Sequence, residues 1–115
     1  MLKTTIKAMT DQYGEPTRVR KKVAAWNVTA HLGVVVQLDS PSYGKDVHVW
    51  LPHFTHAKTV PQNALPYPAD KGRHSGTYAS PELQKGKPAL RVTVKTNSEL
   101  TGLISYINSL RQFKA

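Results

Sequence analysis

The sequence predicts a single α+β domain in which an N-terminal and a C-terminal helix cover one face of a mostly antiparallel sheet of four or five strands. Two patterns carry this prediction. Apolar residues recur at helical spacing near both ends of the chain, and between the ends they alternate with polar residues at a period of two. A chain of 115 residues can enclose one hydrophobic core but not two. We therefore treat residues 1–115 as one domain.

The first helix is predicted over residues 2–13. Its apolar side chains fall three or four positions apart and are Leu2, Ile6, Met9 and Tyr13. The polar side carries Lys3, Lys7 and Asp11. Gly14 followed by Pro16 is a typical helix stop, so we expect the helix to end at residue 13.

The middle of the chain has the pattern of β-strands. Every second residue over 24–38 is apolar, which predicts two half-buried strands divided by a turn or bulge at Gly33. Turn-forming residues crowd positions 39–46, and the alternation then resumes with Val47, Val49 and Leu51. Residues 33–51 are therefore predicted to form a hairpin.

A last strand over residues 90–95 precedes the second helix. Thr96 and Glu99 fit a capping box, and Arg111 and Lys114 suit the C-terminal end of a helix. Its apolar stripe is Leu100, Leu103, Ile104, Ile107 and Leu110. Together the elements predict a core that includes Leu2, Ile6, Met9, Val28, Leu32, Val34, Val36, Val49, Leu51, Leu90, Val92, Leu100, Leu103, Ile104 and Ile107.

The stretch from about 52 to 88 shows no convincing periodicity and contains six prolines and three glycines. Irregular segments of this length are uncommon inside compact domains and often carry function. We predict a long functional loop here. The alternative is a missed strand near residues 76–79 with ordinary connections on either side.

Composition excludes several classes of protein. The absence of cysteine excludes a disulfide framework, thiolate zinc sites, iron–sulfur ligation and cysteine nucleophiles. No run approaches the roughly 18–20 apolar residues that cross a bilayer, and the first ten residues lack the pattern of a secretory signal. We expect a soluble cytoplasmic protein with no membrane partner.

The charge balance favours a polyanionic partner. The chain has 16 Lys and Arg against 7 Asp and Glu, a formal net charge of +9. Cations gathered on one surface bind nucleic acid by releasing condensed counterions. An extended segment at 17–23 would place Arg18, Arg20 and Lys22 on one face, and Arg91 and Lys95 would likewise share a face of the last strand. The predicted nucleic-acid-binding residues are Arg18, Arg20, Lys22, Trp50, Arg73, His74, Tyr78, Arg91 and Lys95, with Trp50 and Tyr78 as candidates for base stacking.

The histidines suggest two alternatives. His48, His53 and His56 lie close in sequence but match no known zinc motif, so no metal or other cofactor is predicted. A metal-independent ribonuclease needs a base, an acid and cations around the phosphate, and His74 beside Arg73, or His53, could serve such chemistry.

Other enzyme classes have less support. The phosphate-binding and dinucleotide-binding glycine motifs are absent, as is the Gly-x-Ser-x-Gly motif, and the acids are too scattered for a magnesium site. The favoured function is non-enzymatic binding of DNA or RNA through a cationic sheet face and loop. A ribonuclease, a small protein-interaction or accessory module whose partner could be an acidic protein, a small-ligand binder and a merely solvated basic surface remain alternatives, and the oligomeric state is open.

Overall fold

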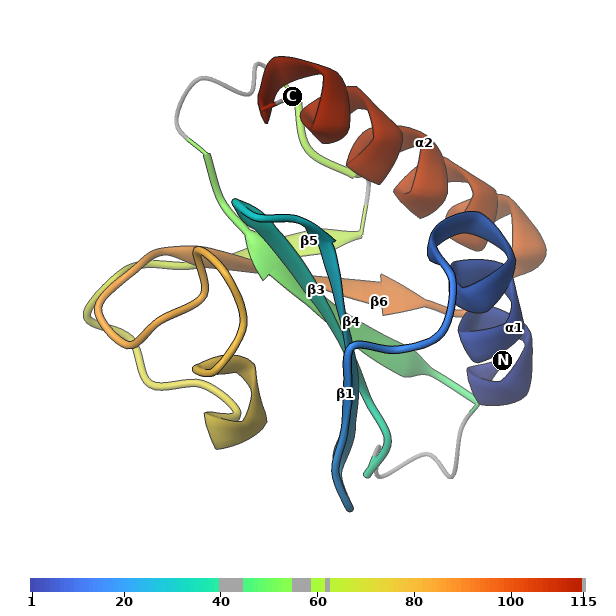
Figure 1. The fold of residues 1–115 in the computed structure, drawn as a ribbon, viewed down its shortest axis with the longest axis horizontal. Helices are drawn as coiled ribbons and strands as arrows, with labels where there is room; N and C mark the ends of the chain where they lie inside the picture. The colour runs from blue at the N-terminus through green and yellow to red at the C-terminus, as the bar shows by residue number, and fades with distance from the viewer. Residues whose placement is uncertain (40–44, 55–58, 62, 115) are drawn as a thin grey trace.

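A computed structural model describes residues 1–39, 45–54, 59–61 and 63–114 of the chain. Two helices accompany one antiparallel sheet of six strands in the order β1-β2-β3-β4-β6-β5 (Figure 1). The elements are α1 (Leu2–Tyr13), β1 (Arg18–Val19), β2 (Val23–Thr29), β3 (Leu32–Gln37), β4 (Val47–Pro52), β5 (Ala64–Tyr67), the 3-10 turn η1 (Ser75–Thr77), β6 (Ala89–Val94) and α2 (Asn97–Lys114). The α+β class is confirmed, with more strands than the four or five predicted. Neither helix, as far as the chain is described, has an apolar stretch sufficient to span a membrane.

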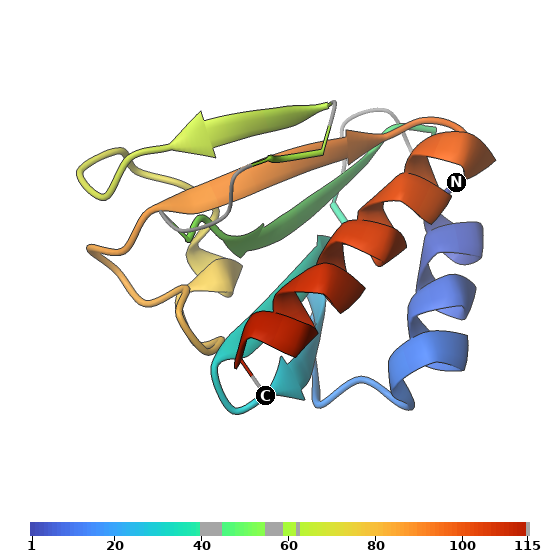
Figure 2. The ribbon, with the colours of Figure 1, turned by 90° about the horizontal axis from the view of Figure 1, so that it is seen from above.

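Both helices lie side by side on one face of the sheet (Figure 2), which we call the helix face. All fifteen predicted core residues lie in the apolar cluster beneath these helices or pack against it. Trp26 joins them at the centre of β2, and its indole N–H donates to the carbonyl of Gly14 at 2.8 Å. The period-two and helical patterns therefore identified this layer correctly.

The helix ends follow the predicted signals. Gly14 adopts a φ of 85°, which favours glycine, and its N–H donates to Thr10 O at 2.9 Å to close α1. At α2 the capping box forms in both directions. The N–H of Glu99 donates to Thr96 Oγ1 at 3.2 Å, and the N–H of Thr96 donates to Glu99 Oε1 at 3.1 Å.

The predicted division of residues 24–38 at Gly33 is wrong by a few residues. The turn between β2 and β3 lies at residues 30–31, and Gly33 is part of β3. A Cβ at Gly33 would lie 2.8 Å from Ser80 Cβ, so the glycine permits another segment to approach the sheet closely. The predicted 33–51 hairpin is confirmed by the pairing of β3 with β4, although its turn at 40–44 lies outside the described residues.

The stretch predicted as one long loop contains β5 at an edge of the sheet. The alternative strand near 76–79 is instead the 3-10 turn η1. Prolines concealed β5 because they cannot donate to a ladder, yet at an edge they are tolerated. The backbone N–H of Thr93 in β6 donates to the carbonyl of Asn63. Because successive residues of a strand point their backbone groups to opposite sides, the nitrogens of Ala64, Pro66 and Pro68 point away from β6. The prolines have no N–H and Ala64 donates to a neighbouring carbonyl, so this edge resists pairing with another strand.

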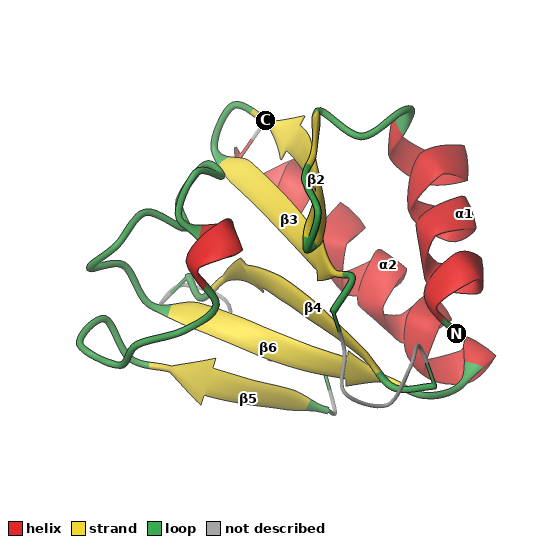
Figure 3. Cartoon of the chain, turned by 90° about the horizontal axis from the view of Figure 1, so that it is seen from below, coloured by secondary structure: helices red, strands yellow, loops and turns green. Residues whose placement is uncertain are grey.

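The other face of the sheet, the second face, is closed differently. Residues 68–88, which we call the covering segment, cross it without forming a long helix or strand (Figure 3). They bury a small apolar cluster made of Val23, Ala25, Val35, Trp50, Tyr67, Leu83 and Ala89. The covering segment does not extend over the whole second face. Near the start of β4, the surface of β4, β5 and β6 has no covering element among the described residues (Figure 3).

Candidate nucleic-acid interface

Arg18, a predicted phosphate contact, binds the covering segment instead of projecting freely. Its Nη2 donates to Gly76 O at 2.9 Å and to Ser80 Oγ at 3.0 Å. Burial, and then the charge of Arg20, lower the pKa of Arg18, although a guanidinium keeps its charge in proteins. These bonds connect β1 to η1 and leave few N–H groups of the Arg18 guanidinium available to a ligand.

Arg73 is held even more completely. Its Nε donates to Thr77 Oγ1 at 3.0 Å, and its Nη1 donates to Lys87 O at 2.9 Å. Its Nη2 donates to the carbonyls of Leu83 and Gln84. Burial lowers the pKa of the Arg73 guanidinium. Arg73 therefore clamps two distant parts of the covering segment together.

The two predicted stacking residues present little free ring surface. Trp50 is 3% exposed, donates its indole N–H to Gln37 Oε1 at 3.0 Å, and meets the Tyr67 ring edge-on. Tyr78 is half-buried, and the Arg73 guanidinium carbon lies 4.9 Å from its ring centroid. Both aromatics stabilise the second face by packing.

His74 also has an internal role. Its Nδ1 accepts the N–H of Gly76 at 3.1 Å, and its Nε2 lies 3.1 Å from a carboxylate oxygen of Asp39. Because Nδ1 must carry a lone pair, the proton is on Nε2 and is donated to Asp39. Neither ring nitrogen is free to take a proton from a ribose hydroxyl in this arrangement.

The other described histidines belong to no cluster of metal ligands. Within the described ranges, no three His, Asp or Glu side chains are placed to hold a metal ion. His53 is half-buried at the end of β4, and its backbone N–H donates to Pro88 O. His56, the third member of the predicted trio, lies outside the described residues.

Residues 17–23 are not one extended segment. β1 ends at Val19, and the N–H of Arg20 donates to Val23 O at 2.8 Å to close a tight turn into β2. Arg18 therefore faces the covering segment, whereas Arg20 and Lys22 are exposed at the turn. The three cations do not share one strand face.

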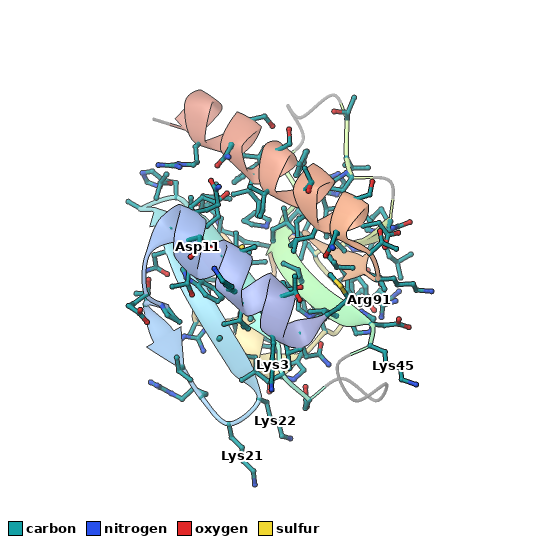
Figure 4. The ribbon with its side chains drawn as sticks, turned by 90° about the vertical axis from the view of Figure 1, so that its right-hand side faces the viewer. Lys3, Asp11, Lys21, Lys22, Lys45 and Arg91 are labelled. Carbon is teal, nitrogen blue, oxygen red and sulfur yellow. The ribbon has the colours of Figure 1, made fainter. Side chains whose placement is uncertain are left out.

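A different group of cations gathers at one end of the sheet. The register pairs Val23 with Gln37 and Val47 with Val94, so the start of β2, the end of β3, the start of β4 and the end of β6 lie at this end. Figure 4 shows lysines of α1, the β1–β2 turn and the start of β4 projecting from the same end of the molecule. We call this group the cationic end, and its exposed members are Lys3, Arg20, Lys21, Lys22, Lys45 and Lys95.

Two acids near the cationic end, Asp39 and Glu99, have other partners, and a third, Asp46, directly follows Lys45 in the chain. Asp39 accepts from His74, and Glu99 accepts the backbone N–H groups of Lys95 and Thr96. The bond from Lys95, followed by those from Asn63 and Thr96, outweighs burial and lowers the pKa of Glu99. Within the described ranges, the ion pairs join Lys7 to Asp11, His74 to Asp39 and Lys87 to Glu82, and none includes a member of the cationic end.

Arg20, Lys22 and Lys95 were predicted as contacts, but Lys3, Lys21 and Lys45 were not. A signal for the missing members exists in the sequence. Lys45 lies two residues before one predicted strand and Lys95 ends another, and antiparallel pairing brings such ends together. Arg91, the last predicted contact, lies on the second face and donates to the Tyr67 hydroxyl at 3.0 Å.

Comparison with known proteins supplies no further indication. No protein-family model matches the chain, no curated protein is significantly similar to it, and no solved structure matches it. The function is therefore argued from geometry and charge.

Proposed function

We propose that the protein binds the phosphodiester backbone of a nucleic acid through its cationic end, without catalysing a reaction on it. The observation that carries this proposal is the convergence of six exposed cations from four separate segments, none of them in an ion pair within the described ranges. Spatial convergence of unpaired cations distinguishes a polyanion-binding surface from an evenly solvated basic one.

The N-terminus of α1 adds to the same field. Both helices begin at the cationic end (Figure 2), but the carboxylate of Glu99 already occupies the N-terminus of α2, whereas the first turn of α1 has no acidic residue. A helix N-terminus carries about half a positive charge, which attracts phosphate within its first turn. Each neutralised phosphate releases counterions, so affinity for duplex DNA should fall with salt at a logarithmic slope of up to about −5 for six contacts.

The binding proposal is preferred over a ribonuclease that uses Arg73 and His74 because both side chains are already bonded within the protein. The two ring nitrogens of His74 are bonded to Gly76 and Asp39, and Arg73 is bonded to four groups of the covering segment. Hydrolysis at this pair would need an open base and a cation free to reach phosphorus.

The decisive experiment compares two charge reversals of equal size. Lys21→Glu/Lys22→Glu changes the cationic end, whereas Lys85→Glu/Lys87→Glu changes exposed lysines of the covering segment. Binding of each variant to single-stranded DNA, duplex DNA and RNA is measured over a series of salt concentrations, with circular dichroism to verify folding. We expect the first variant to lose at least tenfold in affinity and about two from the salt slope on duplex DNA.

The control variant Lys85→Glu/Lys87→Glu should retain most of its affinity for nucleic acid, because these lysines lie on the covering segment and not at the cationic end. Equal losses in both variants would mean that only net charge matters and would refute a localised interface. Binding to none of the three nucleic acids, or binding insensitive to salt, would also refute it. Selective capture of acidic proteins in that case would favour a protein-interaction module.

A further inference from the structure

We propose that Arg91, His48 and Thr93, on the uncovered part of the second face, form a binding site for a single phosphoryl group. The inference rests on the proposed function in one respect, because the phosphoryl group would belong to a bound nucleic-acid strand. A free phosphate offers the same chemistry, and the experiments below separate the two sources.

The sheet brings these three side chains together. His48 in β4 and Thr93 in β6 are direct partners in the register, and Arg91 lies two residues before Thr93 on the same strand face. Diagonal neighbours of this kind are about 7–8 Å apart at Cα, within reach of a long side chain. This part of the face carries no covering element among the described residues (Figure 3).

The three side chains are mainly hydrogen-bond donors with neutral partners. Arg91 Nη1 donates to the Tyr67 hydroxyl at 3.0 Å, and its buried Nε has no acceptor among the described residues. In the described part of the chain, no carboxylate forms an ion pair with Arg91. A guanidinium usually satisfies its fork with a carboxylate or a phosphate, so Arg91 has unused capacity for an oxyanion.

His48 and Thr93 extend this capacity. Thr93 Oγ1 lies 3.3 Å from His48 Nδ1. When the hydroxyl donates to Nδ1, the neutral ring carries its proton on Nε2, which becomes a further donor. The charges that act on the half-buried ring are Arg91 and Asp46. Burial and then Arg91 lower the pKa of His48, and Asp46 partly opposes them.

A second cation borders the site. The Lys71 Nζ lies 4.3 Å from the centroid of the Tyr67 ring, and the guanidinium carbon of Arg91 lies 5.6 Å from the same centroid. Both cations therefore lie within cation–π distance of the same ring. Both would attract an arriving dianion, which favours phosphate over a neutral ligand.

The first experiment uses the unmodified protein, with inorganic phosphate as the probe. His48 is titrated by NMR in phosphate and in sodium chloride at equal ionic strength, and His31, at the opposite end of the strands, serves as the internal reference. A bound dianion favours the imidazolium, so the pKa of His48 should rise in phosphate by about half a pH unit. The resonances of His31 should behave alike in both salts. An unchanged His48 titration would overturn the site.

The second experiment separates the site from the proposed function. Arg91→Lys keeps the charge but loses the fork, and Arg91→Gln loses both, so phosphate affinity should fall in that order. Nucleic-acid affinity should fall about tenfold in Arg91→Gln if the site holds a backbone phosphate. Should Arg91→Gln misfold, the His48 titration of the unmodified protein still decides.

The outcomes of the two proposals differ. A His48 shift in phosphate without any nucleic-acid binding supports the site with a free phosphate as ligand and refutes the proposed function. Nucleic-acid binding that depends on Lys21 and Lys22, with no effect of phosphate on His48, supports the proposed function and refutes the site.

Discussion

The two faces of the sheet are closed by different physical means. The helix face buries a cluster of sixteen apolar residues beneath two amphipathic helices, whereas the second face buries seven beneath an irregular segment. Where apolar area is small, Arg18 and Arg73 fasten the covering segment through hydrogen bonds to carbonyl and hydroxyl groups. Most of the stability from apolar burial therefore resides on the helix face, and the second face depends on directed bonds.

This difference also sorts the positive charges by role. Arginine makes several bonds in a fixed fork, which suits it to an internal clamp. The lysines of the turn and strand ends have no such network and remain at the surface. A basic composition thus contains two populations of cations, of which the exposed population is the better candidate for a ligand.

The largest loss of stability is expected when apolar volume is removed from the helix face. Leu103 is fully buried, so Leu103→Ala should lower the free energy of unfolding by about 2–5 kcal/mol. Thr101→Ala, on the exposed side of α2, should change it by less than about 0.5 kcal/mol. Urea denaturation measures both, and a loss for Leu103→Ala no larger than that of the control would contradict the account.

A smaller and more local effect is expected on the second face. Arg73→Lys retains the charge but cannot reproduce the four bonds of the fork, and should cost about 2 kcal/mol. Hydrogen exchange should show faster opening of amides in the covering segment, with α1 and α2 unchanged. Lys85→Ala is the matched control. Uniformly faster exchange throughout the protein would show that the two faces are not separable.

The smallest effect belongs to the start of α2 and depends on pH. The pKa of Glu99 is lowered in the folded state by its bonds to Lys95, Asn63 and Thr96. Its contribution to stability is therefore complete above the ordinary value of 4.5 and is lost as the pH falls through the lowered value. Glu99→Gln should be less stable than the unmodified protein near pH 7, and the difference should shrink in acid. Thermal melts at pH 3 and pH 7 measure it, and a difference independent of pH would disprove the cause.

Much of the helix face was predictable because its signals are local. The capping box of Thr96 and Glu99 and the stop at Gly14 specify helix ends within a few residues, and side-chain alternation identifies buried positions. β5 was missed because its prolines imitate a loop, and the turn at 30–31 was misplaced because Gly33 has a packing role instead of a turning one.

The candidate site was less predictable. Trp50 looked like an exposed aromatic on a polar strand face, but the covering segment and Tyr67 bury it. Arg73 looked like a free cation in a long loop, but the carbonyls that surround it come from residues 83–87. Both outcomes depend on contacts between residues distant along the chain.

The sequence alone therefore determined the class of fold, the apolar layer under the helices and the size of the positive charge. These properties depend on composition and on spacing between near neighbours. Only the tertiary structure decided which cations are clamps and which are exposed, because the free energy of a charged group depends on the acceptors and the solvent that the whole fold places around it.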